Sequence, residues 1–161
     1  MYRKGHYGVS LLVFAPVGFA LVAAGRPGLA LLTGGTMVWL ATLPDADLRV
    51  PGLTHRGATH TLGFAALVGA GFALAGVLAA RPLGADGALF GTYGFALGAL
   101  AVVAHLVADL LTPAGVALLW PLSGRRYSLS VTTADDPVWN YGLLAVGVLA
   151  ATAAVVGAAR I

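Results

Sequence analysis

Four histidines and six aspartates are the side chains of this sequence best suited to binding a metal ion or moving protons. The chain contains no cysteine and no glutamate, so a metal site would have only imidazole nitrogens and aspartate oxygens as charged or strongly basic ligands. Such ligands are typical of zinc, manganese and iron sites. Serine is scarce, and no nucleophile elbow, Gly-rich phosphate loop or His-Glu-x-x-His motif is present.

His105 and Asp109 have the most informative spacing. Four residues apart on a helix, they lie on one face with about 5–6 Å between their Cβ atoms. They also lie inside the apolar run 100–111, where an uncompensated aspartate is costly and needs a partner. A metal cation is the simplest partner. A His–Asp hydrogen bond that reaches the membrane interface is the alternative interpretation, and this pair alone does not decide between them.

The composition of the whole chain indicates which elements position these residues. Of 161 residues, 59% are hydrophobic and 9% charged, with a mean hydropathy of +0.90, whereas soluble domains carry roughly 25% charged residues. We therefore predict an all-α fold, a polytopic membrane helical bundle in which residues 1–161 form a single domain. The net charge of +3 comes from dispersed basic residues, which argues against nucleic acid as a partner.

Five apolar runs are long enough, or nearly so, to cross a membrane, which takes roughly 20 residues. The second is short, and we expect it to be short or partly re-entrant. The first run, preceded by Arg3-Lys4 and ending in small residues, has a secretory signal peptide as its alternative interpretation. The predicted spans are Val9–Ala24, Leu29–Leu43, His60–Ala80, Ala88–Leu111 and Val138–Ala159.

Five spans put the N-terminus, 44–59 and 112–137 on one side of the membrane. That side carries six basic residues against three on the other, so the positive-inside rule predicts a multi-pass protein of the cell membrane with this face in the cytoplasm. All four histidines and most of the aspartates reach the same face. Asp45 and Asp47 alone would fit a solvated turn, and His6 alone would fit an interfacial residue, but their convergence favours metal ligands.

The loop after the fourth span carries Arg125 and Arg126. Arginine is suited to bidentate recognition of phosphate, while Arg, Tyr and Trp also anchor proteins at headgroup depth. For the two arginines both interpretations stay open. Asp135 and Asp136 precede Pro137 and the fifth span, and we interpret them as a helix N-terminal cap.

The sequence resembles the YdjM family of inner-membrane metal-dependent hydrolases. The His-Arg-Gly-x-Thr-His block is the most specific match, and Thr61 stands where that family often has Ser. The order of the acidic and histidine residues also resembles, more loosely, that of zinc-dependent phospholipase C, whose later ligands have no counterpart after Asp109. The matching segments are Gly5-His6, Leu43–Asp47, His55–Thr61, His105–Asp109, Thr112, Gly115, Pro121 and Arg125–Tyr127.

The resemblance implies an enzyme, a metal-dependent hydrolase of a phosphate ester, acting on a membrane lipid or lipid-linked substrate. One or two divalent ions are expected, zinc before manganese or iron. The implied metal ligands are His6, Asp45, Asp47, His60, His105 and Asp109. Asp109 would bridge ions, His55 would act as general acid or base, Arg56 would neutralise phosphate charge, and Arg125 and Arg126 would contribute to substrate binding.

The main rival is a non-enzymatic membrane transporter or an ion- or lipid-binding protein, since ionisable residues in spans also mark ion pathways. Transporter sites lie near the bilayer midplane between inverted repeats, and no repeat is evident here. A helical haem protein is a weaker rival because the aspartates would have no task. The substrate and the oligomeric state are not predicted.

Overall fold

The computed structural model describes residues 1–161 and is all-helical, with five α-helices and two short 3₁₀ helices. All five apolar stretches are long enough to cross a membrane, the second when counted from Pro27 to Arg49, and the five-span prediction is confirmed. The elements are α1 (Arg3–Ala23), α2 (Pro27–Leu40), η1 (Pro44–Arg49), η2 (Ala58–His60), α3 (Leu62–Ala80), α4 (Gly87–Leu110) and α5 (Pro137–Ala158).

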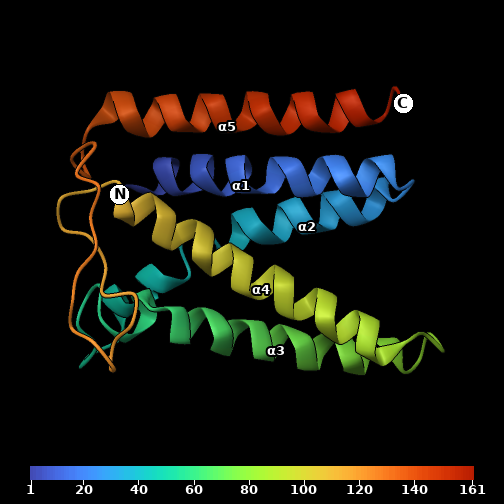
Figure 1. Cartoon of the computed structure of the whole chain (residues 1–161), viewed down its shortest axis with the longest axis horizontal. Helices are drawn as coiled ribbons and strands as arrows, with labels where there is room; N and C mark the ends of the chain where they lie inside the picture. The colour runs from blue at the N-terminus through green and yellow to red at the C-terminus, as the bar shows by residue number, and fades with distance from the viewer.

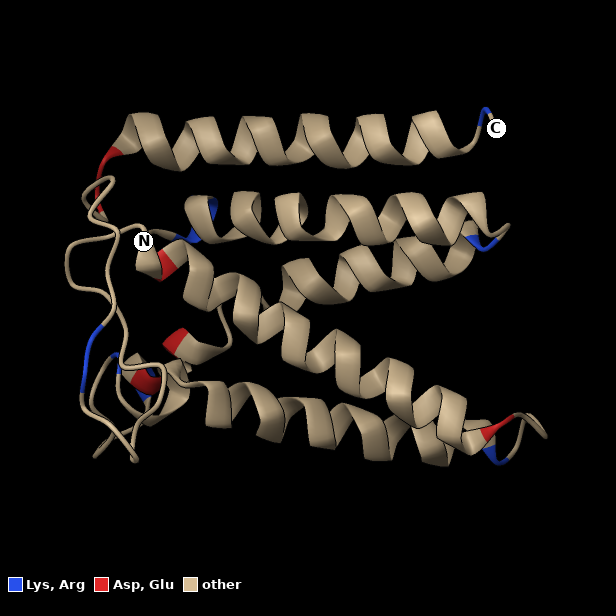
Figure 2. Ribbon diagram, in the orientation of Figure 1, with Lys and Arg blue, Asp and Glu red and all other residues tan.

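Successive helices alternate in direction, so the chain's connections gather at two ends of the bundle (Figure 1). One end, called the polar end below, carries the N-terminus, residues 41–61 with η1 and η2, and the loop 111–136. The other end carries the α1–α2 and α3–α4 turns and the C-terminus. Figure 2 shows charged residues at both ends and none along the middle of the helices, as expected for segments that face lipid.

Polar side chains mark where the helices start. The Thr61 hydroxyl accepts a hydrogen bond from the Phe64 amide at 3.0 Å, and the Asp86 carboxylate accepts one from Ala88 at 2.8 Å. Asp136 does the same for Val138 at 2.8 Å, which confirms the predicted cap of the fifth span. These caps satisfy amides that have no partner within the helix.

Two helix boundaries differ from the predicted spans. Helix α1 begins at Arg3 rather than Val9, so His6 lies within the helix, while the charged Arg3 and Lys4 of its first turn stay exposed at the polar end. Helix α2 ends at Leu40 rather than Leu43. Its 14 residues measure about 21 Å at 1.5 Å per residue, less than the roughly 30 Å of a hydrocarbon core. The chain then turns into η1.

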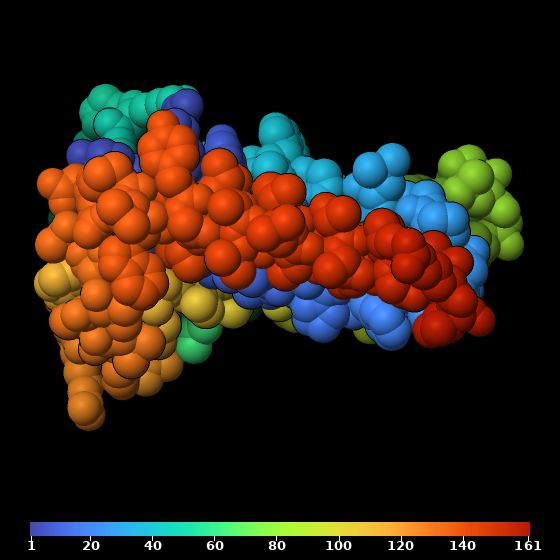
Figure 3. Space-filling model, turned by 90° about the horizontal axis from the view of Figure 1, so that it is seen from above, coloured from blue at the N-terminus to red at the C-terminus, as the bar shows by residue number.

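The helices pack as two close pairs, α1 with α5 and α3 with α4, and α2 lies between α1 and α4 (Figure 1). Glycine permits both close approaches. A Cβ at Gly8 would overlap the α5 backbone at Leu143, and a Cβ at Gly76 would overlap the carbonyl oxygen of Phe90 on α4. Small residues at such contacts let helix backbones approach closely in lipid. Figure 3 shows α5 along one outer face and the 111–136 loop as a broad mass at the polar end.

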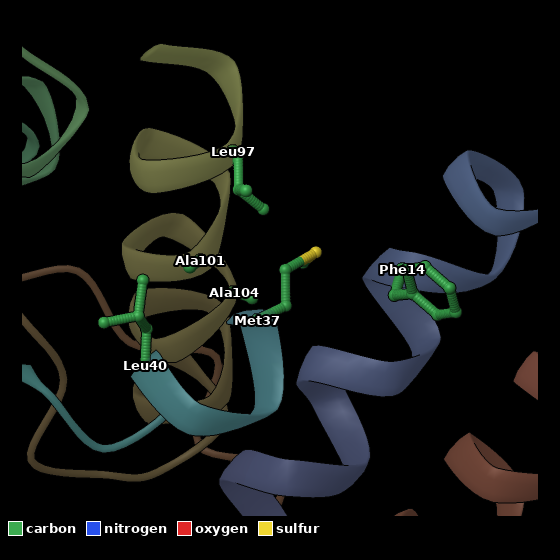
Figure 4. Close-up of a cluster of buried hydrophobic side chains, with 6 residues drawn as sticks. All are labelled: Phe14, Met37, Leu40, Leu97, Ala101 and Ala104. Carbon is green, nitrogen blue, oxygen red and sulfur yellow. The ribbon is translucent and has the colours of Figure 1, made fainter. Parts of the chain in front are cut away.

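An apolar cluster joins three helices beside the polar end. Met37 and Leu40 of α2 face Leu97, Ala101 and Ala104 of α4, with Phe14 of α1 on the other side (Figure 4). The small alanines of α4 let α2 lie close to it. This contact fixes the end of α2 against the last turns of α4, which carry His105 and Asp109.

Candidate metal centre

Five of the six predicted metal ligands meet at the polar end, from four different elements. His6 comes from α1, Asp45 from η1, His60 from η2, and His105 and Asp109 from α4. The three imidazoles and Asp109 are at most 1% exposed, whereas the Asp45 side chain is 22% exposed. The centre is therefore buried among helices and reaches solvent through Asp45.

All three imidazoles direct Nε2 toward the two carboxylates. His60 Nε2 lies 3.4 Å from Asp45 Oδ1 and 3.6 Å from Asp109 Oδ2. His105 Nε2 lies 3.7 Å from each of the same two atoms. His6 Nε2 lies 3.6 Å from Asp109 Oδ1 and 3.8 Å from Asp45 Oδ2, and its ring stacks on His105 with centroids 4.0 Å apart.

The hydrogen bond at the other ring nitrogen fixes the tautomer of His105. Its Nδ1 lies 2.8 Å from the carbonyl oxygen of Ala41. A carbonyl only accepts, so Nδ1 carries the proton and Nε2 has a free lone pair. The Ala41 carbonyl has this role because α2 ends one residue earlier.

The surroundings of His60 lead to the same tautomer. Its Nδ1 lies 3.0 Å from the Thr59 hydroxyl oxygen and 3.3 Å from Asp47 Oδ2. The Thr59 hydroxyl donates its own hydrogen to Asp47 Oδ2 at 2.9 Å, which leaves its oxygen as an acceptor. His60 Nδ1 therefore carries the proton, and Nε2 of His60 also has a free lone pair.

Two such lone pairs face each other, because His60 Nε2 and His105 Nε2 are 3.1 Å apart. Without a proton or a cation between them, this arrangement is repulsive. The buried atoms His6 Nε2 and Asp109 Oδ2 have no hydrogen-bond partner, although buried polar atoms normally have one. One or two cations among these atoms would give them a partner, and His6 Nδ1 alone would stay without one.

The spacing of the donor atoms also fits a metal ion. Ligands about 2.0–2.2 Å from an ion lie roughly 3.0–3.5 Å from one another, and the separations here range from 3.1 to 3.8 Å. Three groups of side chains can hold an ion, and His105 belongs to the first two. They are His6, His105 and Asp109; Asp45, His60 and His105; and Asp47, His55 and His60.

The model of the YdjM inner membrane protein family matches residues 1–160. The chain belongs to this family. Searches of curated proteins and of solved structures find no match.

In this YdjM family member, Asp47 lies on the opposite side of His60 from the central group. Its Oδ1 lies 3.0 Å from His55 Nδ1, and its Oδ2 accepts hydrogen bonds from the Arg56 amide and the Thr59 hydroxyl. Asp47 therefore orients His60 through Nδ1, as carboxylates behind metal-binding histidines commonly do. The 3₁₀ geometry of η1 explains why Asp45 and Asp47, two residues apart, point to different groups.

Arg56 is buried and already paired. Its Nη2 donates to Asp109 Oδ1 at 2.9 Å and its Nη1 donates to the Thr112 hydroxyl at 3.0 Å. The Arg56 backbone has a φ of 58°, in the left-handed region that non-glycine residues rarely adopt. The strained backbone turns the guanidinium inward, where it neutralises Asp109 rather than facing solvent. The α-amino group of Met1 also donates to Asp109 Oδ1, at 2.6 Å.

The remaining predicted site residues lie outside the central group. Arg126 donates to the carbonyls of Ala114 and Gly115 and thereby fixes its own loop, while Arg125 lies 5.3 Å from the Tyr127 ring. His55 is largely exposed and contacts Asp47. His55, Arg56 and Arg126 line a separate cavity of about 440 Å³ that touches none of the five converging ligands.

Two supporting groups were not predicted from the YdjM-like sequence, namely Thr59 and the Ala41 carbonyl. Thr59 lies inside the His55–Thr61 block, and its position next to His60 was the available signal. The carbonyl of Ala41 had no signal, because any residue supplies one and only the early end of α2 frees it.

Replacing Asp47 with asparagine is expected to lower the metal affinity of the centre by about 10- to 100-fold, as is usual when a carboxylate behind a histidine ligand is lost. The amide keeps the size of the side chain but orients His60 less strongly. Competition titration of the purified protein with a chromophoric chelator measures the change. The variant Asp86→Asn, at the opposite end of the bundle, is the control, and equal affinities in both variants would contradict the role given to Asp47.

Proposed function

We propose that this protein is an integral-membrane, metal-dependent hydrolase that cleaves a phosphate ester at its polar end. The facing lone pairs of His60 and His105, 3.1 Å apart beside Asp45 and Asp109, support this proposal most strongly. The family membership agrees with a membrane location, and the early turn after α2 supplies the Ala41 carbonyl that orients His105.

His6, Asp45, His60, His105 and Asp109 would hold one or two divalent ions, with zinc favoured by the imidazole-rich donor set. Such an ion lowers the pKa of water and polarises a phosphoryl group. Asp109 contacts all three imidazoles and is the proposed shared ligand. Asp47 would act as a positioning residue for His60.

In the proposed reaction the oxygen of water bonds to phosphorus while the water gives up a proton, the ester P–O bond breaks, and the departing alcohol takes up a proton, so that no net proton is gained or lost. Water reaches the centre past Asp45, the partly exposed ligand. His55 has one nitrogen on Asp47 and an exposed ring, so we assign it proton exchange with solvent. Arg56 would hold the Asp109 carboxylate in place through its hydrogen bond.

We infer that the substrate is a membrane lipid or lipid-linked phosphate, because the centre lies one to two turns from the end of a span and opens at the membrane surface. His105 is five residues from the end of α4, about 8 Å along the helix. We infer that this face lies in the cytoplasm, because the polar end carries more basic residues than the other end.

The decisive measurement is the metal content of the protein purified without chelator, together with hydrolysis of a chromogenic phosphate diester. We expect about one or two zinc ions per chain. Asp45→Asn should lower the metal content at least about tenfold and abolish hydrolysis, because a neutral amide binds a cation weakly.

Asp86→Asn is the control, since Asp86 lies at the opposite end of the bundle and lines neither cavity, and this variant should keep its metal. Absence of any transition metal from the unmodified protein would refute the proposal. Bound metal without hydrolysis of any phosphate ester would instead indicate an ion-binding protein.

A further inference from the structure

A cavity of about 670 Å³ opens at the polar end between the start of α1, η1 and the start of α5. Asp45 lines this cavity, and it is the one partly exposed member of the converging ligand set. The cavity is therefore the route by which a ligand from outside reaches the centre.

Three cations line the cavity: Arg3, Lys4 and Arg49. All are exposed, and none forms an ion pair within 4.0 Å of a carboxylate. Lys4 donates to the Tyr141 hydroxyl and lies 3.8 Å from the centroid of that ring. Apart from Asp45, the only acidic residue of the lining is Asp135, so the cavity carries an excess of positive charge and attracts anions.

A second cavity, of about 430 Å³, lies within the apolar part of the bundle and shares α1 and α5 with the first, but has α2 in place of η1. Its lining is mostly hydrophobic and comes from α1, α2 and α5. It includes Leu11, Phe14, Leu31, Gly35, Val38 and Val155.

Helical periodicity places the two cavities at one corner of the bundle. Residues seven apart lie on the same face of a helix. Lys4 lines the first cavity and Leu11 the second, seven residues further along α1 and about 10 Å deeper. On α5, Tyr141 and Val155 are related in the same way by twice that spacing. The two cavities share no lining residue, and the apolar one extends along α1 and α2 as far as Val22 and Pro27 at the other end of the bundle. Its near end, at Leu11 and Val38, lies next below the cationic cavity along the same helices.

We propose that this corner between α1, α2 and α5 binds a lipid with a phosphate headgroup. Arg3, Lys4 and Arg49 hold the phosphate beside Asp45, and the hydrocarbon chain lies in the apolar cavity. The assignment rests on the proposed function, because it presents the phosphate to the metal centre. It assigns headgroup recognition to the α1 and η1 cations rather than to Arg125 and Arg126.

Charge and depth together favour this ligand over others. A soluble phosphate ester would use the cationic cavity and leave the apolar one without a role. A helix of a second copy would cover the apolar cavity but would bring no anion to Arg3, Lys4 and Arg49. A phosphate-bearing lipid satisfies both cavities, and its headgroup and chain meet at the membrane surface as these cavities do.

Gly35 offers a way to fill the apolar cavity without disturbing the fold. It is exposed, and a Cβ there meets no atom within 4 Å. Gly71 on α3 has the same freedom but lines neither cavity. Gly35→Phe and Gly71→Phe are therefore a matched pair, in which only the first occludes the proposed chain site.

The test uses the full-length protein in phosphatidylcholine nanodiscs and a non-hydrolysable phosphonate analogue of phosphatidic acid with a diazirine at the end of its acyl chain. After illumination, mass spectrometry locates the cross-linked residues. We expect them on the faces of α1 and α2 that line the apolar cavity and at Val155 of α5. The triple variant Arg3→Gln/Lys4→Gln/Arg49→Gln and the variant Gly35→Phe should each reduce labelling at least about fivefold.

Gly71→Phe and Arg81→Gln, which lie outside the corner, should leave the labelling unchanged. Labelling spread evenly over the lipid-facing helices, or equal in all variants, would overturn the inference. Competition by inorganic phosphate as strong as by unlabelled phosphatidic acid would assign the cationic cavity to a soluble ligand. Conversion of a dimer to a monomer by Gly35→Phe, with labelling unchanged, would assign the apolar cavity to a second copy. Both of these results also overturn the inference.

Binding and hydrolysis are separate measurements here, so the two proposals can fail independently. Specific labelling in a protein that hydrolyses no phosphate ester would refute the proposed function but not the lipid site. Hydrolysis with unspecific labelling would refute the lipid site alone.

Discussion

Replacement of Asp109 by alanine is expected to abolish the proposed metal binding and to destabilise the protein by about 3–5 kcal/mol, the usual effect of deleting one partner of a buried ion pair. Asp109 contacts all three imidazoles and accepts a hydrogen bond from Arg56. Without it, the buried guanidinium of Arg56 keeps its charge but loses its carboxylate.

Metal analysis and thermal unfolding in detergent measure the two effects, with Asp135→Ala as the control at an exposed position of the same end. The double variant Asp109→Ala/Arg56→Leu separates them. Removal of the Arg56 charge as well should recover part of the stability, since only the Met1 α-amino group is then left without its carboxylate, but none of the metal. A single variant that retains full metal content would contradict the central role of Asp109.

Gly76→Leu is expected to have a large effect although the residue lies far from the centre. A Cβ at Gly76 overlaps the backbone oxygen of Phe90, which cannot move away by changing a side-chain rotamer. Helices α3 and α4 must then separate, at a cost above the roughly 1–3 kcal/mol of ordinary overpacking. Because His60 precedes α3 and His105 lies on α4, the metal affinity should fall as well.

Gly71→Leu on the same helix is the control. A Cβ at Gly71 meets no atom within 4 Å, and leucine has a helix propensity about 0.8 kcal/mol better than glycine, so this variant should be no less stable than the unmodified protein. Unfolding in mixed detergent and a chelator titration compare the two variants. Equal stability would show that the α3–α4 contact does not depend on the small residue.

Hydropathy predicted the fold well because the spans are apolar throughout. The fourth predicted span, Ala88–Leu111, differs by one residue at each end from α4. Hydropathy could not locate the start of α1, where His6 is buried by contacts with other segments. From the sequence alone, such a buried histidine cannot be distinguished from a histidine at the membrane interface.

The convergence of the site was predictable from topology, but the roles of its members were not. Asp45 and Asp47 have the same type and nearly the same position in the sequence. In the fold Asp45 faces the three imidazoles, whereas Asp47 faces Nδ1 of His60 and the Arg56 backbone. The direction of each side chain in η1 determines which of the two roles each aspartate has. Neither the composition nor the spacing of the sequence indicates that direction.

The interpretation of three basic residues from the sequence alone was incomplete for a similar reason. Arg3, Lys4 and Arg49 fitted the positive-inside rule, which explains their presence without any ligand. Only the packing of α5 beside α1 and η1 brings them around one cavity. A basic residue can both orient a protein in the membrane and bind a ligand. The pattern of charges in the sequence indicates only the first of these roles.

The shortness of α2 has a consequence for the surrounding bilayer. At about 21 Å this helix falls short of the hydrocarbon thickness, and a bilayer next to a short helix thins locally at a modest energetic cost. The 24-residue α4 imposes no such thinning. The membrane surface should therefore dip beside α2, so that lipid headgroups descend toward the level of Asp45. Hydrophobic mismatch would in this way help to bring a lipid headgroup to a recessed site.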